Sequence, residues 1–303
     1  MNNRFTEQVR LLVAVLPHVA RQRCFSLKGG TAINLFIRDL PRLSVDIDLA
    51  YLPVEDRETS LASIDHALKA IAGDIKRTVP GVNVHGSVLS GTTTWFKFVV
   101  EREGVRVKIE VTPVPRGSVY SSELRELMPR AQAEFGYAQM QLLSFEDVYA
   151  GKLCAALDRQ HPRDLFDVRL LLAAEGITPR LKDAFLVYLL SHHRPMAELI
   201  APTRKDIEAV YEGEFSGMAV ESVPLESLYA AREELITTVQ RMLTEQDRQF
   251  LLAVKRGDAD WSQFPISDVQ RLPAIQWKMH NLSLMEPAKR QKAIKALERA
   301  LYG

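Results

Sequence analysis

The sequence predicts a protein of the α+β or α/β class, with a mixed β-sheet flanked by helices and followed by a mainly helical lobe. Three observations support this prediction. Helical and strand periodicities alternate in the first part, an antiparallel series of three strands follows, and the periodicity becomes helical after about residue 138. We therefore expect two domains, residues 1–138 and residues 139–303, with a boundary between Tyr137 and Leu142.

The elements of the first domain follow from the spacing of apolar residues and from turn residues. Helical spacing from Leu11 to Val19 predicts an opening helix. A short strand then ends at Lys28, and Thr31 is expected to cap a helix that stops before Pro41. The later elements are one helix, at Leu61 to Ile75, and four strands, at Ser44 to Ala50, Val82 to Leu89, Trp95 to Glu101 and Val105 to Thr112. Gly104 predicts that the last two strands form a hairpin.

The second domain is expected to be a series of helices. Ser144 and Asp147 are spaced as a capping box that opens a helix through Leu157. Further helix starts are expected near Pro162, Pro179, Pro224, Thr244 and Glu286.

Composition bounds the class of protein. The chain is 47% hydrophobic and 25% charged, as in a soluble globular protein. Lys plus Arg number 39 against 38 for Asp plus Glu, so a nucleic-acid partner requires a local basic patch. Cys24 and Cys154 lack the spacing of a disulfide framework or a metal site, and the N-terminal apolar run resembles neither a signal peptide nor a membrane span. We expect a cytoplasmic protein without a membrane partner.

Asp46 and Asp48 form the first candidate site. Alternate side chains of a strand point to the same face, so both carboxylates project together while Ile47 projects from the other face. Like charges so close are costly unless a cation neutralises them, and a hard divalent ion is the usual neutraliser. The alternative is a solvated strand edge.

Glu110 is the third candidate carboxylate. It shares one face of its strand with Arg106, Lys108 and Thr112, opposite an apolar face. If this strand lies beside the strand of Asp46, the three carboxylates converge and can hold metal and activate a hydroxyl. Alternatively, Glu110 only pairs with Lys108 or Arg106.

Gly29, Gly30 and Thr31 separate a strand from a helix. Two glycines permit close approach of a ligand to the backbone, and the helix start offers N–H groups to phosphate. The segment lacks the spacing of a Walker A loop, and an ordinary turn is the alternative interpretation.

The fourth cluster lies in the helical half. Asp164 and Asp167 are three residues apart and Arg163 and Asp167 four apart, so each pair can share a helix face. Together with Lys152 and Arg159, these residues either form an ion-pair network at the surface or bind a triphosphate. Spacing alone leaves both interpretations open.

Taken together, these segments resemble the AbiEii/AbiGii toxin family, a part of the polymerase-beta-like nucleotidyltransferase superfamily. The resemblance covers roughly residues 25 to 172. It rests on Lys28-Gly-Gly-Thr-Ala32, Arg42-Leu-Ser-Val-Asp-Ile-Asp-Leu49, Lys108-Ile-Glu-Val111, and Lys152 followed by Arg159 and Arg163-Asp-Leu-Phe-Asp167.

The resemblance implies the toxin half of a toxin–antitoxin or abortive-infection pair. Members similar to the mycobacterial MenT toxins transfer nucleotides from an NTP to the 3′ acceptor end of tRNA. The implied partners are therefore an NTP, RNA and a cognate antitoxin protein.

The resemblance also implies roles for individual residues. Asp46 and Asp48 would bind Mg²⁺ or Mn²⁺, and Glu110 would complete the carboxylate set as a ligand or a base. The implied nucleotide-binding residues are Lys28, Gly29, Gly30, Thr31, Ser44, Arg163 and Asp164. Lys152 would contact the triphosphate, and Asp167 would be needed for activity. Ser44 also matches a position that some antitoxins of the family phosphorylate, where added negative charge would repel the triphosphate.

Two other functions remain open at this point. The same fold can transfer a nucleotidyl or phosphoryl group to a protein, and a non-catalytic module can bind NTP or RNA.

The RNA-facing patch is expected among Arg38, Arg42, Lys97, Arg106 and Arg116. His192 and His193 are interpreted as a pair at the C-terminus of a helix.

Overall fold

The computed structural model describes residues 3–88 and 91–303, and the chain divides into two compact units. Unit 1 runs to Val148 and includes the segment Ser216–Ser222, whereas unit 2 comprises Tyr149–Phe215 and Val223–Gly303. The predicted boundary at 138/139 lies before this division. The strand β7 (Gln139–Leu142) accounts for the difference, because it pairs within the sheet of unit 1.

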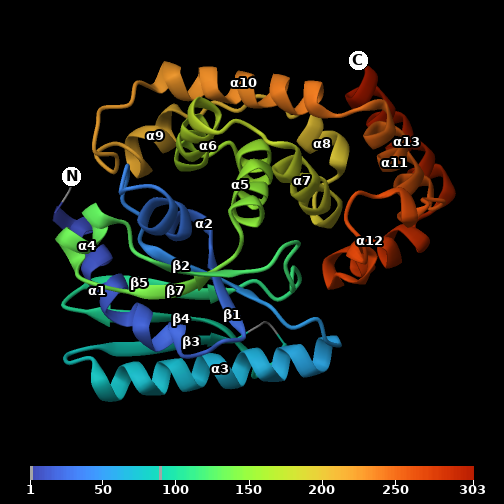
Figure 1. The fold of residues 1–303 in the computed structure, drawn as a ribbon. Helices are drawn as coiled ribbons and strands as arrows, with labels where there is room; N and C mark the ends of the chain where they lie inside the picture. Colours follow the sequence, from blue (N-terminus) through green and yellow to red (C-terminus); the bar gives the residue numbers. More distant parts are fainter. Residues whose placement is uncertain (1–2, 89–90) are drawn as a thin grey trace. The chain divides into compact units, whose positions relative to one another are not determined.

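Unit 1 contains a mixed sheet in which the strands follow the order β3-β4-β5-β2-β1-β7-β6 (Figure 1). Two neighbouring pairs, β2 with β5 and β1 with β7, are parallel, and the other neighbours are antiparallel. Besides β7, the strands are β1 (Phe25–Lys28), β2 (Asp46–Tyr51), β3 (Asn83–Val88), β4 (Trp95–Arg102), β5 (Val105–Val111) and β6 (Glu123–Glu126). The predicted mixed sheet is confirmed.

Helices α1 (Asn3–Ala20) and α3 (Arg57–Thr78) pack against strands of this sheet and against each other. His18 Nδ1 lies 2.7 Å from Asp74 Oδ2 and so joins the two helices. The other helical elements are α2 (Gly29–Thr31), the π-helical η1 (Ala32–Ile37), α4 (Pro129–Phe135) and α5 (Phe145–Arg159), in which the two units meet along the chain.

The predicted hairpin is confirmed, because β4 and β5 pair antiparallel and Glu103 and Gly104 both adopt a positive φ in the turn. The expected cap by Thr31 is wrong. The helix begins at Gly29, and the Thr31 hydroxyl donates to the carbonyl of Asp46 at 2.5 Å. The predicted strand to Leu89 ends at Val88 within the described residues, and Leu89 lies outside them.

The segment Ser216–Ser222 returns to unit 1 and bonds to the backbone just before β2. Leu43 N donates to Met218 O and Val220 N donates to Pro41 O, each at 3.0 Å, and Arg42 forms a β-bridge with Ala219. Residues more than 170 positions later therefore hold the backbone just before Asp46.

Unit 2 consists of helices, as predicted. In addition to the part of α5 in this unit, they are α6 (Pro162–Ala174), α7 (Pro179–Ser191), α8 (Met196–Ile200), α9 (Glu208–Glu214), α10 (Leu225–Met242), α11 (Glu245–Arg256), α12 (Pro273–Ser283) and α13 (Pro287–Tyr302), with 3₁₀ turns at η2 (Trp261–Gln263) and η3 (Val269–Arg271). The helix start expected near Thr244 is confirmed with a capping box, since Thr244 and Asp247 bond reciprocally through their side chains and backbone N–H groups.

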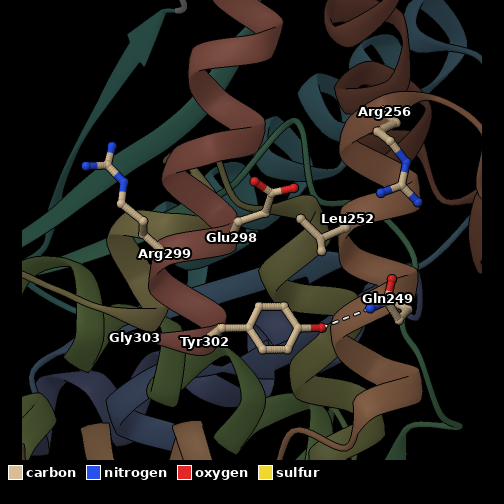
Figure 2. A pocket seen from close by; sticks show the side chains of 7 residues that line it. All are labelled: Gln249, Leu252, Arg256, Glu298, Arg299, Tyr302 and Gly303. Carbon is tan, nitrogen blue, oxygen red and sulfur yellow. Dashed lines mark hydrogen bonds between the residues drawn. The ribbon is translucent and has the colours of Figure 1, made fainter.

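Helices α11 and α13 pack together and border a pocket of about 480 Å³ (Figure 2). Side chains of both charge signs line it, and the hydroxyl of Tyr302 bonds with Gln249 across it at 3.0 Å. Within the described ranges, no helix is long and apolar enough to cross a membrane. Both cysteines are free thiols; Cys154 is buried as expected, whereas Cys24 is only half-buried.

Candidate active site

Parallel pairing of β2 with β5 brings the predicted carboxylates together. The register places Asp48 opposite Glu110 and Asp46 opposite Lys108. Residues paired across neighbouring strands point to the same face, so all three carboxylates project from one face of the sheet. The condition set by the sequence, that the strand of Glu110 lies beside that of Asp46, is met.

The opposite face of these strands is apolar. Ile47, Leu49, Ile109 and Val111 are each 0% exposed, whereas Asp46, Asp48 and Glu110 are half-buried. Strand alternation therefore anchors one face in the core and leaves the carboxylates within reach of a ligand.

Two lysines partly neutralise the carboxylates. Lys108 Nζ lies 2.7 Å from Glu110 Oε2, as one alternative interpretation of the sequence expected. Burial alone would lower the pKa of Lys108, but its bond to Glu110 and the charge of Asp46 outweigh burial and raise it. Lys28 is paired with Asp48 in the β1–β2 register.

Lys28 occupies a more enclosed position. Its ammonium donates to Thr112 Oγ1 at 3.0 Å. Burial lowers the pKa of Lys28, although the charges of Asp48 and Glu110 oppose that shift. Lys28 and Lys108 thus both lie among the carboxylates of this face.

The Gly29–Gly30 turn lies close to the Asp48 carboxylate. Gly29 has a φ of +73°, and a Cβ at this position would lie 2.7 Å from Asp48 Oδ2. A side chain at Gly29 is thus disfavoured both by the backbone conformation and by the adjacent carboxylate. Glycine at this position therefore leaves room for the Asp48 carboxylate beside the turn.

Two buried polar residues, Ser44 and Arg42, lie next to Gly30. A Cβ at Gly30 would lie 2.8 Å from Ser44 Oγ and 3.0 Å from Arg42 Nη2. Thr31 Oγ1 is hydrogen-bonded to Ser44 Oγ at 3.0 Å, which links the turn to the segment leading into Asp46. Ser44 is only 8% exposed, so its hydroxyl acts here as part of the packing of the turn.

The donor set fits a hard divalent cation, because carboxylate oxygens are the ligands such ions prefer. Asp46, Asp48 and Glu110 would hold it. In the part of the chain that the structure describes, however, their ligand atoms do not form a set within 4.8 Å of one another. Glu110 is instead in an ion pair with Lys108.

In unit 2, Lys152 of α5 lies between two aspartates of α6. Its Nζ is 2.7 Å from Asp164 Oδ1 and 3.0 Å from Asp167 Oδ2. The side chains of Lys152, Asp164 and Asp167 are 6%, 1% and 0% exposed. Burial would raise the pKa of Asp164, but Lys152 and Arg159 outweigh it and hold that pKa far below its usual range.

Of the two interpretations left open by the sequence, a surface network does not describe Lys152, Asp164 and Asp167, because these three residues are buried. Arg163 pairs with Glu214, Nη2 to Oε2 at 3.5 Å, rather than with Asp167. A buried ion pair orders the helices that carry it, and removal of one partner is costly.

Two of the arginines expected in an RNA-facing patch are not available for it. Arg42 is 2% exposed and donates to Leu43 O, and Arg116 is 8% exposed and donates to Pro113 O. Arg106 is exposed but paired with Glu101 at 2.8 Å. Charge pattern alone did not distinguish these buried arginines from surface ones.

One set of possible metal ligands was missed by sequence reasoning. The ligand atoms of Asp158, His192 and His193 lie within 4.8 Å of one another. His192 is the C-cap of α7, as predicted. Arg194 donates through Nε to Asp158 and through its backbone N–H to His192 Nδ1, so a bound cation would have to compete with that arginine.

Carboxylates on adjacent strands beside a glycine turn agree with the nucleotidyltransferase class that the sequence motifs indicated. The family model described as "Nucleotidyl transferase AbiEii toxin, Type IV TA system" matches residues 10–281. The chain belongs to this family. It is a nucleotidyltransferase toxin of a type IV toxin–antitoxin system, with an NTP as substrate and an antitoxin as partner.

The structure is similar to that of MenT4, a nucleotidyltransferase toxin from Mycobacterium tuberculosis H37Rv. The TM-score is 0.57 at 16% sequence identity, over 98% of this chain and 93% of that chain. At this identity the likeness shows the fold, and it agrees with the predicted mixed sheet with flanking helices. No curated protein matches the sequence.

Substitution of Gly29 by Ala tests whether the turn holds Asp48. We expect Gly29→Ala to reduce nucleotidyl transfer about 100-fold or more, because displacement of a reacting group by about 1 Å has such an effect. Gly104→Ala is the matched control, since its φ is +77° but a Cβ there meets nothing within 4 Å. Both variants should lose about 1–2 kcal/mol of stability from the left-handed conformation. Equal rates of nucleotidyl transfer in Gly29→Ala and Gly104→Ala would contradict a role of the Gly29 turn in positioning Asp48.

Proposed function

We propose that this enzyme transfers nucleotides from an NTP to RNA, at the 3′ acceptor end of tRNA, in a reaction that depends on Mg²⁺ or Mn²⁺. The observation that carries the proposal is the single face shared by Asp46, Asp48 and Glu110 on β2 and β5. The family supplies the reaction class, and the resemblance to MenT toxins supports the choice of tRNA.

The chemistry requires one bond to form and one to break. The acceptor hydroxyl attacks the α-phosphorus of the NTP, and the bond from that phosphorus to the pyrophosphate oxygen breaks. A divalent ion held by Asp46 and Asp48 would act as a Lewis acid that stabilises negative charge on the transferring phosphate. Glu110 is placed to accept the hydroxyl proton or to add a ligand.

The basic and backbone groups beside the carboxylates would hold the triphosphate. Lys28 offers an ammonium on the same face, and Gly29 and Gly30 give phosphate oxygens close access to the backbone. Ser44 would support this turn through Thr31.

We extend the proposal to the cluster in unit 2, in which Lys152 would contact the triphosphate and Asp167 would be required. Asp164 and Arg163 would arrange the cluster. Its support is the buried position of the Lys152 Nζ between the carboxylates of Asp164 and Asp167.

Labelled NTPs, Mg²⁺ and total tRNA test the main proposal. We expect label on tRNA with the wild type, and none with Asp46→Ala or with tRNA whose 3′ end has been oxidised. Glu101→Gln is the matched control, because this carboxylate lies on the same hairpin but pairs with Arg106. Label on a protein band would favour a protein acceptor. No label on any acceptor would contradict transfer.

A charge-free replacement tests the cluster in unit 2. In the double variant Lys152→Met/Asp167→Leu, Asp164 keeps Arg159 as its partner, 2.5 Å away. Apolar replacement of a buried pair commonly preserves folding. We expect an unchanged unfolding transition, a raised KM for NTP and a loss of activity of about 100-fold, as for other positioning groups. Wild-type kinetics in the folded double variant would show that the cluster serves only stability.

A further inference from the structure

Four basic side chains without ion-pair partners in the described part of the chain form a stripe along one side of α13, called the α13 stripe below. Lys289, Lys292, Lys295 and Arg299 are spaced by three or four residues, so they share one side of the helix, opposite buried Ile294, Leu297 and Leu301. These four side chains form no ion pair within residues 3–88 and 91–303. Glu298 is the one acidic residue of α13. The stripe extends about 15 Å at the helical rise per residue.

The last turn of α11 adds a buried cation. Lys255 is 7% exposed, and it has neither an ion pair nor a side-chain hydrogen bond among the described residues. Burial lowers the pKa of Lys255, and the charges of Arg290 and Lys289 lower it further. A buried lysine without a partner is unfavourable unless a ligand supplies negative charge.

Two more cations border Lys255, and among the described residues their side chains donate hydrogen bonds to backbone carbonyls only. Lys278 of α12 donates to His192 O at 2.5 Å and to Arg194 O at 3.2 Å. Arg290 donates to the carbonyls of Arg256 and Leu282, at the ends of α11 and α12. Burial and the charge of Lys255 lower the pKa of Lys278 to about 8. These hydrogen bonds position the cations without neutralising them.

The arrangement favours an extended polyanion over a single small anion. Lys255, Lys278 and Arg290 concentrate positive charge at one end, and the α13 stripe continues it along the helix. Regularly spaced cations on an exposed helix fit the repeated phosphates of a nucleic acid. An NTP would engage only part of such a surface.

We propose that the α13 stripe, together with the half-buried Lys278 and Arg290, binds the phosphate backbone of the RNA acceptor, and that the buried charge of Lys255 adds to the positive potential of this surface. The inference rests on the proposed function, since it assumes that RNA is the substrate. It is separate from the patch expected among Arg38, Arg42, Lys97, Arg106 and Arg116, in which Arg42 and Arg116 are buried.

Binding of fluorescent total tRNA, measured by anisotropy with the full chain carrying Asp46→Ala, tests the surface without turnover. We expect the triple variant Lys289→Gln/Lys292→Gln/Lys295→Gln to weaken binding at least about tenfold. It should also reduce the slope of log affinity against log salt by about 0.7–0.9 for each phosphate that the variant no longer neutralises. The matched control is Lys69→Gln/Lys76→Gln/Arg77→Gln, which removes three exposed cations from α3.

Lys255→Met provides a second variant with a different signature. We expect it to weaken tRNA binding and to increase the midpoint of unfolding, because an unneutralised buried charge is removed. Unchanged tRNA affinity in the triple variant overturns the inference, even where labelling of tRNA succeeds. Equal weakening in the α3 control overturns it as well, since binding would then follow net charge alone. Failure of the labelling experiment with intact binding would contradict the proposed function instead.

Discussion

The site depends on the parallel pairing of β2 with β5, which holds Asp48 beside Glu110 and keeps Asp46 on the same face. Three half-buried carboxylates repel one another, and Lys28 and Lys108 are among the charges that offset that repulsion. The apolar residues on the other face of these strands are fully buried. The strands therefore cannot shift to separate the carboxylates without disrupting the packing of the core. A site that holds acidic groups at such cost is ready for a cation and for the phosphates the cation brings.

The turn at Gly29 and the segment before Asp46 are shaped by the same constraint. Gly29 leaves room for Asp48, while Gly30 leaves room for Ser44 and the buried guanidinium of Arg42. The returning segment around Met218 holds the backbone ahead of β2. In the motif Arg42-Leu-Ser-Val-Asp-Ile-Asp, the first residues therefore pack against the turn, and the two aspartates are the proposed cation ligands.

Much of the site follows from local sequence rules, and the rest depends on packing between distant residues. Strand alternation predicted the shared face of Asp46 and Asp48 and the apolar face opposite, and glycine spacing predicted the turn. Periodicity could not show that Arg42 is buried, because an arginine before a strand has the same pattern whether it faces solvent or lies beneath Gly30. It also missed the short strands β6 and β7, whose pairing is with each other and with β1. Asp158 meets His192 only because α5 and α7 come together, so no spacing in the sequence indicated that set.

Metal-dependent stabilisation of the protein tests the central claim most directly, because it needs neither an acceptor nor turnover. The claim is that Asp46 and Asp48 form a cation site. Manganese at about 100 times its dissociation constant should add about 2.7 kcal/mol to the unfolding free energy of the wild type. We predict that Asp48→Asn abolishes this gain and that His193→Ala, which alters the other possible ligand set, retains it. Retention of the full gain in Asp48→Asn, or its absence in His193→Ala, would contradict the claim.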